Sequence, residues 1–170
     1  MSFGQLKQIW SIMRLRNGPQ VLPYSYGLLL VFMAIHMLID IVFSGREALQ
    51  WPNLLGSVVN TLFTAGFVYV LLQWARKMQR LVQTLLALLG VEILIGLIGA
   101  VMLLLYKIPA LSALVSLMWL GLVVWNVMIA AHIFRHALDI RMLWGIALSI
   151  LYIVLAYNVM VAVAALSEMT

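Results

Sequence analysis

A single carboxylate, Glu92, lies near the middle of the longest apolar stretch of the chain, residues 81–106. At about 1.5 Å per residue this stretch exceeds the roughly 30 Å hydrocarbon core of a bilayer, so we predict a membrane-spanning helix. An ionisable group at this depth costs at least about 2.5–3.5 kcal/mol, and is expected to face protein or water rather than lipid. Such a group can hold a proton or hydrogen-bond a neighbouring helix, and it is the strongest indication of chemistry in the sequence.

His36 and Asp40 form a second group that could do chemistry, because residues four apart share one face of a helix. The carboxylate could orient the imidazole and so provide one step of a proton relay. The alternative is that Asp40 is hydrated near the membrane boundary and simply satisfies His36.

Counting about 1.5 Å per residue along each predicted span places one polar residue or more of every helix inside the membrane, most of them between the midplane and the outer leaflet. These residues form the predicted intramembrane cluster, at approximate depths from the cytoplasmic end of ~21 Å for His36, ~27 Å for Asp40, ~20 Å for Asn60, ~16 Å for Glu92, ~12 Å for Asn126 and ~24 Å for Asn158.

Glu92 shares a helix face with Gly96, Gly99 and Ala100, so the sequence predicts that another helix approaches closely along this strip of small residues. Three roles remain open for the carboxyl group. It could make a neutral interhelical hydrogen bond that fixes the register of the helices, handle protons in transport, or contact another subunit.

Several kinds of catalytic site are excluded. The chain has no cysteine, which rules out thiol nucleophiles and thiolate metal sites. Two histidines that share one haem iron must lie at nearly the same depth, whereas His36 and His132 are separated by ~18 Å. The sequence also lacks a Gly-x-Ser-x-Gly motif, a His-Glu-x-x-His zinc motif and a glycine-rich phosphate loop. We therefore predict a protein that is not an enzyme and has no cofactor or metal.

The composition determines which elements must position these residues. With 66% hydrophobic and 9% charged residues, the chain has too little polar surface for a soluble globule of 170 residues. We predict an all-α integral membrane protein with one transmembrane domain, residues 18–170. The net charge of +5 is attributed to basic loops rather than to binding of nucleic acid. The predicted spans cover residues 22–43, 53–73, 81–106, 110–134 and 142–166.

The segments between the spans are predicted to be short. Residues 44–52, with Arg46 and Glu47, form a loop; residues 74–80 and 135–141 form charged hairpins; and Pro109 marks a tight turn. The first span is too long for a signal peptide and lacks a cleavage site, so we expect it to be retained.

Residues 1–17 are predicted to form an amphipathic helix at the membrane surface, because apolar side chains recur at helical spacing from Phe3 to Met13. A helix packed on a partner or on the protein's own loops would show the same pattern. The candidate contacts with anionic headgroups and the boundary region are Lys7, Trp10, Arg14 and Arg16.

The distribution of Lys and Arg predicts the orientation, since cytoplasmic loops carry the excess. One side of the predicted bundle has eight basic residues and the other has Arg46 and Lys107, which places the amino terminus in the cytoplasm and the carboxyl terminus, with Glu168, outside. The eight are Lys7, Arg14, Arg16, Arg76, Lys77, Arg80, Arg135 and Arg141.

Over residues 18–166, five closely spaced spans with a cytoplasmic amino terminus resemble the Yip1-type membrane proteins. Eukaryotic members carry Asp-Leu-Tyr-Gly-Pro ahead of the spans, whereas here Gly18 and Pro19 are followed by Leu22, Pro23 and Tyr24. The resemblance therefore extends to the small bacterial members, which implies no defined activity and no functional residues.

Two functions follow as hypotheses. In the first, a protein of the cell inner membrane acts through interaction with lipid, with another membrane protein or with itself, as a scaffold, assembly factor or accessory subunit. In the second, a small proton-coupled carrier or permease uses Glu92 with His36 and Asp40.

Overall fold

The computed structural model describes residues 3–43 and 50–167, and all regular structure in these ranges is helical. The predicted loop residues Arg46 and Glu47 and the tail residue Glu168 lie outside the described residues. The elements are α1 (Phe3–Met13), η1 (Pro19–Val21), α2 (Tyr26–Phe43), α3 (Trp51–Trp74), η3 (Met78–Arg80), α4 (Leu81–Tyr106), η4 (Pro109–Leu111), α5 (Ser112–Leu138) and α6 (Met142–Ser167).

Four helices, α3 to α6, are long and apolar enough to cross a membrane, and α2 is a shorter apolar helix. The bounds of α4 coincide with the predicted span. In contrast, α2 begins at Tyr26 rather than at residue 22, because Pro23 holds the preceding chain outside the helix. The predicted hairpin 135–141 begins too early, since α5 continues to Leu138 and ends where Asp139 adopts a left-handed conformation with φ 53°.

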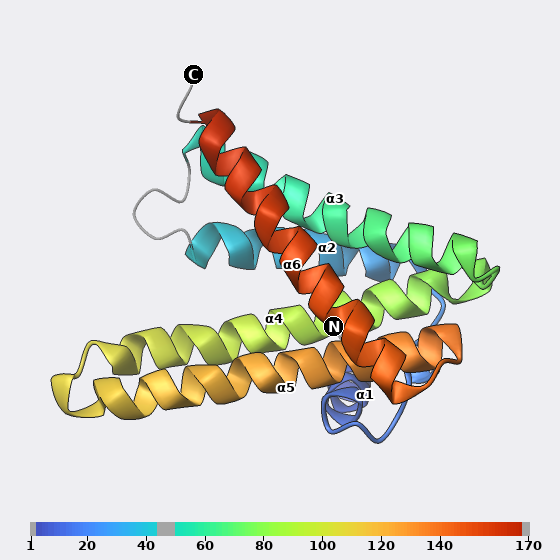
Figure 1. Cartoon of the computed structure of the whole chain (residues 1–170), viewed down its shortest axis with the longest axis horizontal. Coiled ribbons are helices and arrows are strands. Elements are labelled where there is room, and N and C mark those ends of the chain that lie inside the picture. Colours follow the sequence, from blue (N-terminus) through green and yellow to red (C-terminus); the bar gives the residue numbers. More distant parts are fainter. Residues whose placement is uncertain (1–2, 44–49, 168–170) are drawn as a thin grey trace.

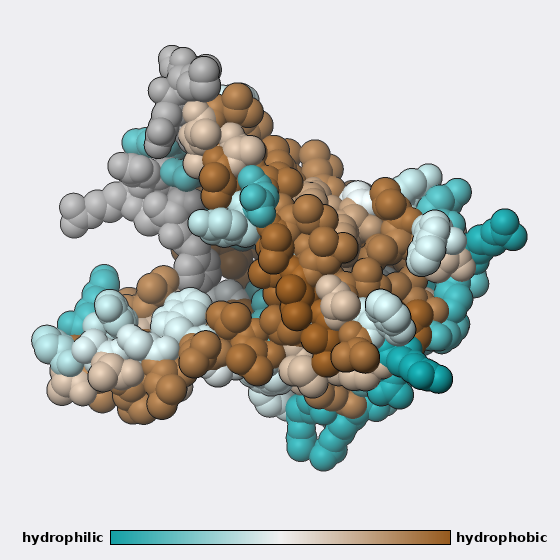
Figure 2. Space-filling model, viewed as in Figure 1, coloured by the Kyte–Doolittle hydropathy of each residue, from teal (hydrophilic) through white to brown (hydrophobic). Residues whose placement is uncertain are grey.

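The helices pack tightly at one end and diverge at the other (Figure 1). Helices α4 and α5 lie side by side as an antiparallel hairpin, and α6 crosses them to reach α3. In the first half of α4 every residue from Thr84 to Val91 is buried, because α1, α2, α3 and α5 all contact this helix. Further along, Leu97, Val101 and Leu104 are exposed. In Figure 2 most hydrophilic side chains gather around the tightly packed end, apolar surface covers much of the middle of this face, and a smaller hydrophilic group lies at the far tip of the α4–α5 hairpin.

Helix α1 differs from the predicted surface helix in what its apolar face contacts. Ile9, Ile12 and Met13 are fully buried, each at 0% exposure. A Cβ atom added at Gly90 of α4 would lie 2.8 Å from Ile9 Cδ1, so the absence of a side chain at Gly90 leaves the space that Ile9 occupies. Trp125 Nε1 donates a hydrogen bond of 3.1 Å to the carbonyl of Met13. The apolar face of α1 is therefore an internal packing face.

The four candidate membrane-surface residues all have exposed side chains. Lys7 and Trp10 of α1 are exposed, as are Arg14 and Arg16 after its end. Their contact with headgroups stays a prediction.

Asp139 connects the two short loops at the tightly packed end. Its Oδ2 lies 2.7 Å from Lys77 Nζ and 2.9 Å from Arg80 Nη1. Lys77 also donates to the carbonyl of Leu138, and Arg80 to that of Ala137. Hydrogen bonds from Arg80 and Lys77 lower the pKa of Asp139 to about 2.

We expect this interaction to give a pH-dependent difference in stability between the wild type and Asp139→Asn. Because the folded pKa of Asp139 lies below the unfolded value of about 3.9, its contribution is present above pH 4 and is lost as the pH falls through about 2. Asparagine keeps the left-handed conformation accessible but cannot titrate. Unfolding in mixed detergent between pH 7 and pH 2 measures the difference, which should be small because the carboxylate is 57% exposed. A difference that stays constant over this range would contradict the assignment.

Candidate functional site

A cavity of about 480 Å³ lies between the diverging halves of α2 to α6. Figure 2 shows the molecule hollowed on this side, between the α4–α5 hairpin and the helices above it. Five of the six residues predicted to form an intramembrane cluster line the cavity: His36, Asp40, Asn60, Glu92 and Asn126. The remaining wall is apolar and aromatic, with Trp119 and Tyr157 among its residues.

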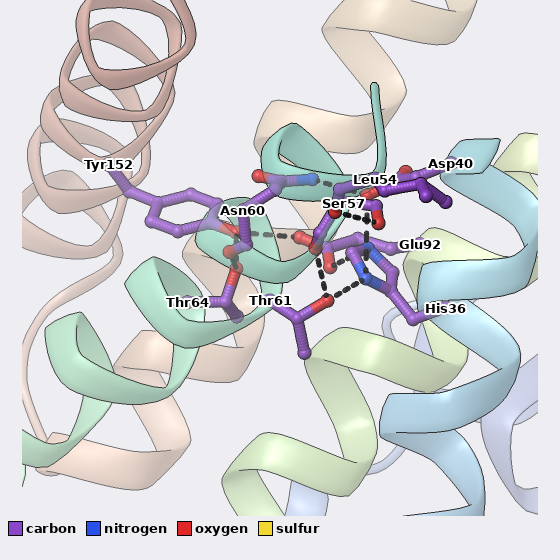
Figure 3. A network of polar contacts seen from close by, with 9 residues as sticks. All are labelled: His36, Asp40, Leu54, Ser57, Asn60, Thr61, Thr64, Glu92 and Tyr152. Atoms are coloured by element: carbon purple, nitrogen blue, oxygen red, sulfur yellow. Dashed lines mark hydrogen bonds and ion pairs between the residues drawn. The ribbon is translucent and has the colours of Figure 1, made fainter. Parts of the chain in front are cut away.

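At the floor of the cavity, His36 of α2 and Glu92 of α4 point toward one another (Figure 3), with 3.0 Å between His36 Nε2 and Glu92 Oε2. His36 is 4% exposed, so its ring is held by protein on nearly all sides. The packing of α2 on α4 brings the two residues together.

The hydroxyl of Thr61 determines which nitrogen of His36 carries a hydrogen. Thr61 Oγ1 donates to the carbonyl of Ser57 at 3.0 Å, which uses its single hydrogen. Thr61 Oγ1 must then accept the 2.9 Å contact from His36 Nδ1, so Nδ1 is protonated. His36 Nε2 and Glu92 Oε2 lie 3.0 Å apart, which makes an ion pair when the imidazole is protonated, but Glu92 Oε2 has no hydrogen-bond partner among the described residues. A protonated imidazole beside an ionised carboxylate would leave the pair neutral as a whole.

The other oxygen of Glu92 begins a chain of hydroxyl groups. Tyr152 OH lies 2.7 Å from Glu92 Oε1 and 2.8 Å from Thr64 Oγ1, and Thr64 Oγ1 lies 3.1 Å from the carbonyl of Asn60. The hydroxyl groups of Tyr152 and Thr64 have one hydrogen each, so only two of these three contacts can be hydrogen bonds at the same time. When Glu92 Oε1 is unprotonated, Tyr152 donates to it, and Thr64 makes one of its two contacts as a donor.

A proton added at Glu92 Oε1 completes this chain. Glu92 then donates to Tyr152, Tyr152 to Thr64, and Thr64 to the carbonyl of Asn60. The same heavy-atom positions thus accommodate either one or two exchangeable protons at the His36–Glu92 pair. Tyr152 lies on α6 and Thr64 on α3. The change in the direction of their hydrogen bonds therefore links the second proton to both helices.

Asp40 lies next to this network but orients His36 less than the four-residue spacing predicted. Its Oδ2 accepts a 2.8 Å hydrogen bond from Asn60 Nδ2 and lies 3.8 Å from His36 Nδ1, which is closer to Thr61. The main partner that orients the imidazole is therefore the Thr61 hydroxyl, while Asp40 faces the cavity.

Two expectations about the cluster differ from the structure. Asn158 is exposed on α6, and its Nδ2 donates to the carbonyl of Val154 in the same helix, away from the cavity. Gly96 and Gly99, predicted to admit a closely packed helix, line the cavity instead. The absent side chains leave space next to Glu92 because α4 and its neighbours diverge here.

Sequence reasoning did not include Tyr152, Thr61 and Thr64 in the cluster, although their hydroxyl groups complete it. The signal was available for Tyr152, which lies ~15 Å along its helix from Met142, close to the ~16 Å depth of Glu92. The hydroxyls of Thr61 and Thr64 also bond to the carbonyl one turn earlier in α3, as such side chains commonly do within a helix, so their types alone do not indicate a partner on another helix.

Comparisons of the chain with protein-family models, with curated proteins and with solved structures found no match.

Proposed function

We propose that the protein is a small proton-linked carrier of the cell inner membrane that binds a solute in the cavity between α2 and α6. The observation that carries this proposal is the position of Glu92, which faces a cavity of about 480 Å³ rather than a closely packed helix. Solute sites of this size are typically apolar with a few placed polar groups. Intramembrane carboxyl and imidazole groups are typical of proton and substrate pathways.

In this proposal α2 is a fifth span and the basic end is cytoplasmic. An 18-residue helix covers about 27 Å, close to the thickness of the hydrocarbon core. The excess of Lys and Arg at the tightly packed end supports the orientation. The cavity then opens toward the opposite side of the membrane.

The variant Glu92→Gln tests the proton-linked role, because glutamine keeps the shape and a hydrogen-bonding oxygen but cannot ionise. We expect wild-type protein in liposomes with an entrapped pH dye to move protons when a solute is added from a panel of amines, amino acids and organic acids. In Glu92→Gln this flux should fall at least about tenfold, equivalent to roughly 1.4 kcal/mol.

A matched control is Ser116→Ala, which removes an exposed hydroxyl that donates within α5 to the Ser112 carbonyl. This control should retain the wild-type flux. Wild-type liposomes that move no protons with any solute, or an unchanged flux in Glu92→Gln, would refute the carrier.

A second candidate function, interaction with another membrane helix, is favoured by Asn158. Its exposed amide lies well inside a helix long enough to cross a membrane, where a polar side chain facing lipid is costly. A scaffold or accessory subunit would cover it with a second copy or another protein. Photo-crosslinking from position 158 in native membranes tests this role, and crosslinks to lipid alone would contradict it.

A further inference from the structure

A second and much smaller cavity adjoins the main cavity of about 480 Å³ next to Glu92. It offers about 10 Å³ of space for the centre of a water molecule and is lined by residues of α4, α5 and α6. Glu92, Asn126, Tyr152 and Ile153 line both cavities. We propose that the small cavity binds one water molecule, held by Asn126, through which a proton passes from the main cavity to Glu92. The role in proton transfer rests on the proposed function, whereas the water site itself does not.

The size and the lining of the small cavity suit a single water molecule. A buried water needs roughly 10–15 Å³ of such space and about two to four polar partners. The small cavity reaches the lower end of this range, so it has no room for a larger solute. Wholly apolar cavities stay dry, but here three of the eight lining residues carry polar groups: Glu92, Asn126 and Tyr152.

The side chain of Asn126 requires a hydrogen-bond partner in this position. It lies within α5, one of the helices long and apolar enough to cross a membrane. Its amide can both donate and accept hydrogen bonds, yet it makes none with another described residue. An amide away from bulk water is costly without a partner, and ordered waters commonly supply one. A water in the small cavity removes this cost.

Glu92 offers one of its two oxygens to this water. Its Oε2 is fully covered by protein, so the oxygen that a water can reach is Oε1. Oε1 lies 2.7 Å from Tyr152 OH and, when ionised, has a further lone pair that can accept a hydrogen from the water. The hydroxyl chain connects Glu92 to α6 and α3, and the water extends the network to Asn126 on α5.

The water lies next to the oxygen that receives the second proton. In the transfer, one O–H bond of the water breaks as the O–H bond at Glu92 Oε1 forms, and the water takes up a proton from a hydronium ion in the main cavity. The products are two neutral waters and a protonated carboxyl group, so atoms and charge balance. Asn126 itself gains and loses no proton. It is a positioning residue that orients the water.

Crystal structures of the full-length protein and of two variants test the water site. Asn126→Leu keeps the approximate size of the side chain and removes its hydrogen bonds. Ala130→Val fills the small cavity alone, because Ala130 does not line the main cavity. We expect density for one water within hydrogen-bonding distance of Glu92 Oε1 and the Asn126 amide in the wild type, and no such density in either variant.

Two further variants are matched controls. Asn126→Thr retains a hydroxyl that donates and accepts hydrogen bonds, so it should retain the water. Ala156→Val adds the same side chain as Ala130→Val, but to the wall of the main cavity, and should also retain the water. A wild-type map that resolves ordered waters elsewhere in the bundle but none at this site would overturn the inference. A water that persists in Ala130→Val would overturn it as well.

Proton flux in liposomes tests the role of the water. In Asn126→Leu the solute-driven flux should fall at least about tenfold, because transfer through one water is lost. Asn126→Thr should restore the flux to nearly the wild-type level. An unchanged flux in Asn126→Leu, or an equal loss in both variants, would refute the positioning role of Asn126.

The water relay and the proposed function can fail separately. A water at this site in a protein that moves no protons with any solute supports the site and refutes the carrier together with the relay. Solute-driven proton flux in a protein without this water supports the carrier and refutes the relay.

Discussion

Replacing His36 with leucine is expected to lower the free energy of unfolding by about 3 kcal/mol, because it leaves Glu92 Oε2 without its partner. Loss of one member of a buried pair costs about 3–5 kcal/mol. The lower end applies here, since the Glu92 side chain retains 20% exposure and lines the cavity. Titration of purified protein from mild detergent into dodecyl sulfate, followed by circular dichroism, measures the change.

A double-mutant cycle with Glu92→Leu identifies the cause of this loss. The double variant His36→Leu/Glu92→Leu contains no unpaired carboxyl group, so it should be more stable than His36→Leu alone. Independent effects of the two substitutions would show that the pair is not coupled. In that case the geometry at the floor of the cavity would not represent an interaction.

Gly145→Ala is expected to destabilise the protein by about 3 kcal/mol through a steric clash between two helices. A Cβ atom at this position of α6 would overlap the carbonyl oxygen of Ala131 in α5 and lie 3.2 Å from its carbonyl carbon. Backbone atoms within a helix cannot move aside as a flexible side chain can, so the two helices must separate. The same detergent titration measures this effect.

Gly121→Ala provides the matched control, because a Cβ there would have nothing within 4 Å. Alanine favours the helical conformation over glycine by up to about 1 kcal/mol, so the control should be neutral or slightly stabilising. Equal destabilisation by both substitutions would mean that helix propensity, rather than the approach of α6 to α5, determines the result.

The long helices could be predicted from the sequence because their signals are local. The apolar run 81–106 is preceded by Arg80 and followed by Lys107, and the structure has the same bounds for α4. The environment of α1 could not be predicted, because an apolar face recurring at helical spacing is the same whether lipid or protein covers it. That choice depends on Gly90, a residue far away in the sequence whose role emerges only when Ile9 is placed against it.

The depth of the candidate-site residues in the membrane could be predicted from the sequence, but the direction in which their side chains point could not. Depth alone placed His36 and Glu92 near one another, and the structure brings them into contact. It also placed Asn158 with them, although the rotation of α6 about its axis turns that residue outward and Tyr152 inward. Rotation is determined by packing, here by contacts such as that of Gly145 with Ala131, which a single sequence does not reveal.

The position of α1 has a consequence for the order in which the chain assembles. The Met13 carbonyl is bonded by Trp125, 112 residues later in the sequence, and the Asn17 carbonyl lies 3.0 Å from Nε2 of His132. Synthesis proceeds from the amino terminus, so α1 is made before α4 and α5, the two helices that form its binding site. Helix α1 therefore docks only after α4 and α5 are in place, and it cannot be the nucleus around which they assemble.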